Sequence, residues 1–154
     1  WFPLLWRIPD QPELGSHCCP LLSWSAIIEA VILGEHDRGS NVEPIQVKLV
    51  SKVTISNVYS STTINNDIAL LKLSSPVTLT PRISPVCLAP STINILPGTC
   101  CFTTGCGRTA TTTSPLILQQ TGIPITSPAV CRQILGQNSI TDAMICASYT
   151  LTRN

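Results

Sequence analysis

The sequence predicts an all-β fold with one short helix, on three observations. Thirteen prolines among 154 residues, together with many Thr, Ser, Val and Ile residues, favour strands and turns over helices. Apolar and polar residues alternate from Ile45 to Ile55, and a nearly continuous apolar run extends from Ile68 to Leu73. The length indicates a single compact domain, or parts of two small ones, and no internal repeat or heptad pattern occurs.

The first predicted strand covers residues 45–55. A period of two is typical of a strand that buries one face and leaves the other solvated. Ser51 interrupts the apolar side, and the polar side carries two lysines. The positions expected to face the core are Ile45, Val47, Leu49, Val53 and Ile55.

The second predicted strand covers residues 68–73, and Asp67 directly precedes it. Its nearly continuous apolar character is typical of a strand buried on both faces. An ionised carboxylate beside such a strand costs free energy unless a donor hydrogen-bonds to it. A histidine Nδ1–H is one donor that would make the arrangement chemically useful. The alternative is that Asp67 is a turn residue that ends the loop before the strand.

The later elements follow from turn and cap signals. Residues 73–97 contain five prolines and little alternation, which predicts an extended connection between two lobes. Residues 109–114 form a Thr-rich loop. Ser127 followed by Pro128 predicts a helix that begins there and ends near Leu135, with Ser as the N-cap and Pro at the first helical position.

Several ordered motifs are similar to those of the chymotrypsin-like serine proteases (the trypsin/chymotrypsin family). The segment Asn-Asn-Asp-Ile-Ala-Leu-Leu-Lys-Leu at residues 65–73 resembles the aspartate segment of that family, and Gly-Thr-Cys-Cys-Phe-Thr-Thr-Gly-Cys-Gly-Arg at residues 98–108 resembles another of its motifs. The resemblance runs from about Leu33 to Ala147, about three-quarters of the chain, and is closest to the pancreatic chymotrypsins and chymotrypsin-like digestive proteases. The remaining similar segments are residues 33–38, 43–47, 82–88, 118–120, 131–133 and 140–147.

This resemblance implies an incomplete double antiparallel β-barrel of the trypsin-like type. Residues 1–154 would form a partial domain, with an unaligned segment at 1–22, a remnant of the first barrel at 23–85 and the start of the second barrel at 86–154. An incomplete barrel exposes strand edges, which are liabilities for aggregation. We therefore expect a half-open assembly of sheets of marginal stability.

The resemblance implies two catalytic positions and no nucleophile. Asp67 corresponds to the family's aspartate, and His17 in Gly-Ser-His-Cys is the candidate histidine, the alternative being a solvated loop histidine beside a disulfide cysteine. His36 is expected to be an exposed loop residue. The family's Gly-Asp-Ser-Gly-Gly-Pro string does not occur, and no serine has a Gly-x-Ser-x-Gly setting, including Ser127, Ser139 and Ser148. The chain is therefore expected to be inactive as a covalent catalyst.

The eight cysteines favour an oxidising compartment. Cys131 and Cys146 correspond to a bridged pair in the family, whereas Cys18, Cys87 and Cys101 correspond to cysteines whose partners lie outside the resemblance, and Cys106 stands where the family has Trp. We therefore expect intermolecular disulfides from the unpaired thiols. A metal site is the competing interpretation, but without a Cys-x-x-Cys pair we expect none. Its ligands would be His17, Cys18, Cys19, Cys100, Cys101 and Cys106.

Composition excludes several function classes. A net charge of +1, with only 11% charged residues against about 25% in typical proteins, provides no basis for binding nucleic acid or an anionic membrane. No apolar run approaches the roughly 20 residues needed to span a bilayer, and Trp1 begins no recognisable signal peptide. The cysteines indicate an extracellular protein, and we expect it to have no cofactor. The resemblance implies that its family acts on polypeptide substrates.

Three hypotheses remain for function. The first is a truncated chymotrypsin-like serine endopeptidase of secreted or dietary proteins, inactive as this chain. The second is a secreted non-catalytic homologue that binds a partner through its loops, which predicts a stable monomer with every cysteine paired. The third is an unrelated disulfide-linked β domain, which the order of the motifs disfavours.

Overall fold

The computed structural model describes residues 14–17, for which only the backbone is considered, and residues 29–148. Within them the chain is mostly β, with two antiparallel sheets and one short helix, as the sequence predicts. No described helix has the length and apolar character needed to span a bilayer.

The first sheet has the strand order β1-β4-β3-β2. Its strands are β1 (Leu14–His17), β2 (Ala30–Leu33), β3 (Gln46–Ile55) and β4 (Ala69–Leu73), all paired antiparallel. β3 is long enough to serve both neighbours. Its first half pairs with β2 and its second half with β4, and the register with β4 shifts between Val50 and Lys52. Such an irregularity bends a strand.

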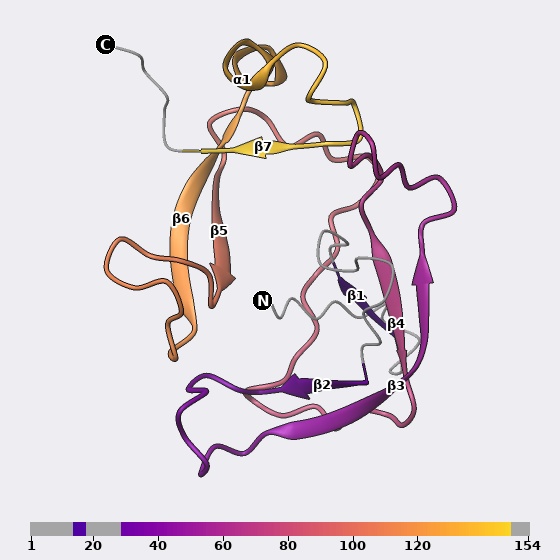
Figure 1. Cartoon of the computed structure of the whole chain (residues 1–154), viewed down its shortest axis with the longest axis vertical. Coiled ribbons are helices and arrows are strands. Elements are labelled where there is room, and N and C mark those ends of the chain that lie inside the picture. The colour runs from indigo at the N-terminus through magenta and orange to yellow at the C-terminus, as the bar shows by residue number, and fades with distance from the viewer. Residues whose placement is uncertain (1–13, 18–28, 149–154) are drawn as a thin grey trace.

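The second sheet has the order β5-β6-β7, and the helix follows its central strand. Its strands are β5 (Cys100–Gly105), β6 (Gln119–Thr126) and β7 (Cys146–Ala147). In Figure 1 this sheet and the first one lie on opposite sides of the view, and the connection from β4 to β5 runs between them. That connection contains the five prolines and forms no helix or strand.

The helix α1 (Pro128–Leu135) has the bounds that its sequence signals predict. The Ser127 side chain accepts a hydrogen bond from the Val130 N–H, and Pro128 occupies the first turn, where its missing N–H costs nothing. Cys131 is the buried residue of the helix and forms a disulfide with Cys146 of β7, the pair that the family resemblance implies. The bridge ties the helix to the edge of the second sheet.

Two expectations about burial were wrong. Of the five positions predicted to face the core, only Val53 is partly buried. The other four are exposed because no described layer covers that face of the strand: Ile45 is 40%, Val47 59%, Leu49 61% and Ile55 44% exposed. Residues 68–73 are not buried on both faces. Ile68 precedes the strand and is half exposed, and within β4 the buried residues alternate with half-buried Leu70 and exposed Lys72.

The core is small. It centres on the alternating face of β4, to which Leu33 of β2 and Ile83 of the connection add apolar surface. Gly34 is required next to it because its φ is +79° and a Cβ there would lie 3.1 Å from the Ile83 side chain. The described apolar residues that are buried are Leu33, Ala69, Leu71, Leu73, Ile83, Ile125 and Cys131.

Candidate active site

The predicted aspartate, Asp67, lies just before the amino-terminal end of β4, the strand with the most buried residues among those described. Asp67 precedes β4 by two residues, is partly buried overall, and has a buried Oδ1 atom. The buried face of β4 begins at Ala69, which is 1% exposed. A carboxylate in this position is held by the strand that follows it and is partly withdrawn from water.

The loop before Asp67 has two residues with positive φ and is held in place by hydrogen bonds. Ile64 and Asn66 adopt the left-handed conformation, with φ of 54° and 55°. Asn tolerates this conformation, whereas for the β-branched Ile64 it is an outlier that costs roughly 1–2 kcal/mol. The Asn66 side chain donates to the Val58 carbonyl at 3.2 Å, and the Ser60 N–H donates to the Asn65 carbonyl at 3.1 Å. These bonds hold the turn that sets the direction of Asp67.

A residue from the second half of the chain also contacts this loop. The Thr141 hydroxyl donates to Asn65 Oδ1 at 2.5 Å, across 76 residues of sequence. Thr141 lies in the segment between α1 and β7, so the aspartate loop is a place where the two halves of the chain meet. Sequence reasoning did not find this contact, because neither residue carries a local signal that names the other.

The backbone register brings the candidate histidine close to the same strand. β1 pairs with β4 so that His17 is opposite Ala69, two residues after Asp67. Neighbouring strands lie about 4.8 Å apart, so the two chain segments adjoin. The side chain of His17 lies outside the described part of the structure, as do Cys18 and Cys19, and the pairing of His17 with Asp67 therefore stays a prediction.

The other residues considered for catalysis lie in a loop, at a helix cap or in a turn, away from any described contact with Asp67. His36 is exposed, and its backbone N–H donates to Glu43 Oε2 while its carbonyl accepts from the Leu118 N–H. Ser127 caps α1, and Ser139 is exposed in the turn after it. None of these side chains is placed beside Asp67 by a contact that the structure describes.

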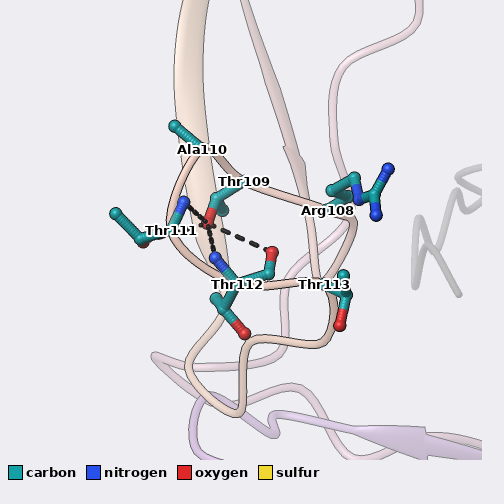
Figure 2. Close-up of a pocket in the computed structure, with 6 residues that line it drawn as sticks. All are labelled: Arg108, Thr109, Ala110, Thr111, Thr112 and Thr113. Carbon is teal, nitrogen blue, oxygen red and sulfur yellow. Dashed lines mark hydrogen bonds between the residues drawn. The ribbon is translucent and has the colours of Figure 1, made fainter.

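The described residues form no metal site, and an open hollow lies beside the Thr-rich loop. No group of three or more His, Cys, Asp or Glu side chains among them is arranged to hold a metal ion. The hollow, of about 590 Å³, is lined by residues 108–113 of the Thr-rich loop (Figure 2). The Thr109 hydroxyl there accepts from the Thr111 and Thr112 N–H groups, so the loop uses this hydroxyl to hold its own turn.

Glu43 anchors the loop 34–43, and its surroundings lower the pKa of its carboxyl group. Its Oε2 accepts from the N–H groups of Asp37 and His36, both at 2.8 Å, and its Oε1 accepts from Arg82 at 2.8 Å. The Asp37 N–H, followed by the His36 N–H and Arg82, lowers the pKa of Glu43 from 4.5 to about 2, although partial burial opposes this. Arg82 also donates to the Gly34 carbonyl, which ties the loop to the connection.

Glu43→Gln is expected to destabilise the chain in a pH-dependent way. A carboxyl group with a lowered pKa in the folded state stabilises that state above its unfolded pKa of 4.5, and the contribution is lost as the pH falls through about 2. The stability difference between the two proteins, measured by urea unfolding, should be largest at about pH 6 and should shrink as the pH falls toward about 2. Asp142→Asn is the control, since that side chain is fully exposed in its ion pair with Arg132. A difference for Glu43→Gln that does not change with pH would contradict the assignment.

Four described cysteines are free. Cys87 and Cys100 are exposed, and Cys101 and Cys106 are partly exposed. Cys101 lies within β5, whereas Cys106 follows that strand and Cys87 lies in the connection. The free states of Cys87 and Cys101 agree with the expectation that their usual partners lie outside the resemblance.

Comparison with known proteins gives one family. The family model described as Trypsin matches residues 16–154, nearly the whole chain. The match includes His17, Asp67 and both cysteines of the disulfide.

Proposed function

This chain belongs to the trypsin family, and from that premise we propose that it is a chymotrypsin-like serine endopeptidase by descent whose 154 residues do not cleave peptide bonds by themselves. The observation that carries the proposal is the position of Asp67. Its carboxylate is partly buried at the start of β4, and β4 is the strand with which the His17 segment pairs. This arrangement supports the aspartate and histidine part of a triad.

The same chemistry gives the reason for inactivity. A serine hydroxyl is a weak nucleophile until a histidine accepts its proton, and the aspartate holds that histidine in the correct tautomer. Backbone N–H groups then stabilise the oxyanion, each typically contributing about 2.7–4 kcal/mol. No serine of these 154 residues has the family's Gly-Asp-Ser-Gly setting, so they supply no serine in the position of the family's nucleophile. An oriented histidine without a nucleophile does not form an acyl-enzyme.

Substrate class and compartment follow as parts of the proposal. Polypeptides of secreted or dietary origin are the substrates that membership of this family favours. An extracellular location is supported by the Cys131–Cys146 disulfide, since such bonds persist in oxidising compartments. The alternative, a non-catalytic homologue that binds a partner, predicts that every cysteine is paired. The four free thiols among the described residues argue against it.

Active-site labelling tests the proposal. The 154-residue chain is incubated with a fluorescent fluorophosphonate, which labels activated serines, and with chromogenic peptide substrates, beside an active trypsin as positive control. We expect neither labelling nor hydrolysis above the buffer rate. Labelling that is abolished in His17→Ala and falls about 10⁴-fold in Asp67→Asn would show a working nucleophile and overturn the proposal.

A further inference from the structure

β5 presents an unpaired edge. It is the outermost strand of the order β5-β6-β7. The Ile125 N–H donates to the Thr99 carbonyl at 2.8 Å. With the register between β5 and β6, this bond shows which residues of β5 direct their main-chain groups toward β6. Since main-chain groups of successive residues point to opposite sides of a strand, those of Cys101 face β6, whereas the N–H and C=O groups of Cys100, Phe102 and Thr104 point outward. Within the described chain, no further hydrogen bond reaches these outward groups.

This edge lacks the usual protection against pairing. Natural edge strands carry charged residues or proline, or are covered by another element. The β5 sequence, Cys-Cys-Phe-Thr-Thr-Gly, has neither a charge nor a proline, and Phe102 is 75% exposed beside exposed Cys100. β2, one of the two edge strands of the first sheet, differs in being shorter and in having Glu29 and Glu35 near its ends.

The strand is complementary to a second copy of itself. With no charge on β5, two copies meet without repulsion between like charges. In an antiparallel pair centred on Cys101, Cys100 of each copy exchanges backbone hydrogen bonds with Phe102 of the other. The two Cys101 residues then form a non-hydrogen-bonded pair with Cα atoms about 4.5 Å apart, within the range for a disulfide. Cys101 is free and partly exposed, as this bond requires.

We propose that two copies of this chain associate through their β5 edges, in the register centred on Cys101, and that an intermolecular Cys101–Cys101 disulfide locks the pair. The occupant of the edge is thus a second copy of the chain, and the inference does not depend on the proposed catalytic history. A register centred on Phe102 would instead place Cys101 opposite Thr103 and form no disulfide.

The covalent step needs an oxidant, for which a small-molecule disulfide such as oxidised glutathione serves. The Cys101 thiolate of one copy attacks a glutathione sulfur, forms a mixed disulfide and releases one glutathione. The Cys101 thiolate of the second copy displaces the other glutathione. Two protein thiols are oxidised, one glutathione disulfide is reduced, and the two thiol protons end on the two glutathione molecules released.

The first experiment locates the cross-link. The 154-residue chain is equilibrated with a mixture of reduced and oxidised glutathione, quenched by alkylation, and analysed on a non-reducing gel, by light scattering and by peptide mapping. We expect a covalent dimer joined at Cys101. Cys101→Ser should lose it, whereas Cys87→Ser and Cys106→Ser, which remove free thiols outside the strand, should keep it. A wild-type chain that stays monomeric, or a covalent dimer that persists in Cys101→Ser, overturns the proposal.

The second experiment separates strand pairing from chance collision of thiols. Phe102→Pro removes one outward N–H from each copy without removing a bond to β6, and Phe102→Ala keeps the N–H as the matched control. The rate of covalent dimer formation should be about tenfold lower for the proline variant than for the alanine variant. If circular dichroism shows that Phe102→Pro misfolds, Phe102→Lys supplies an edge charge instead and should also slow dimer formation relative to Phe102→Ala. Equal rates for the edge variant and the alanine control would contradict pairing through β5.

Discussion

Leu71→Ala is expected to lower the free energy of unfolding by about 2–5 kcal/mol. Leu71 is 3% exposed at the centre of β4, between Ala69 and Leu73, which are buried on the same face. Truncation removes apolar contacts and leaves a cavity that the paired strands cannot close completely. The change should appear as a lower urea midpoint in a denaturation curve followed by circular dichroism.

Leu49→Ala is the matched control for that experiment. Leu49 is also a strand leucine of the first sheet, but it is 61% exposed on β3. Its truncation should change the unfolding free energy by only about 0.5 kcal/mol. If the two variants lose stability equally, then the uncovered face of β3 is buried in solution and the small core centred on β4 is misplaced.

Replacement of both Cys131 and Cys146 by serine is expected to cost about 3 kcal/mol, from the greater chain entropy of the unfolded state. The bridge closes a loop across a separation of 15 residues, and it ties α1 to β7, whose two residues provide little pairing of their own. The second sheet should therefore lose its β7 edge first. Urea unfolding of the oxidised chain and the double variant measures the difference.

Two comparisons control for the loss of the thiols themselves. Reduction of the wild-type chain should lower its stability to that of the double variant, and Cys87→Ser, at an exposed free cysteine, should leave stability within about 0.5 kcal/mol. A double variant as stable as the oxidised chain would show that the bridge contributes little and that packing around buried Cys131 holds the helix.

The elements that the sequence predicted well are those with local causes. Ser127 and Pro128 specify the start of α1 through local interactions, since the Ser127 side chain accepts a hydrogen bond from the Val130 N–H three residues later. The helix has the predicted bounds. The strand at Gln46–Ile55 follows from a local period-two pattern, and the strand at Ala69–Leu73 follows from a local, nearly continuous apolar run. Which face of a strand is buried depends on what else covers it. The alternation in β3 therefore predicted the strand correctly and the burial of Val47 and Leu49 wrongly.

In the candidate site too, the features with local causes were predicted and the long-range contacts were not. Asp67 was identified by its position before an apolar strand, and the structure places it, partly buried, before β4. The contact from Thr141 to Asn65 joins segments that are distant in the sequence. The Glu43 carboxylate accepts hydrogen bonds from two backbone N–H groups and from distant Arg82. Neither interaction could be predicted from a local residue pattern. Long-range pairing of this kind is a property of the folded topology.

The strand order of the first sheet also has a consequence for synthesis on the ribosome. β1 precedes the other strands of its sheet in the sequence, yet its partner is β4, with Leu14 opposite Lys72. At a translation rate of roughly 5–20 residues per second, β1 waits about 3–12 s before its partner has been made. During that interval the β2–β3 hairpin can form, while the segment that carries His17 has no strand of its sheet to join. The β1 segment therefore stays without its pairing strand until β4 has been synthesised.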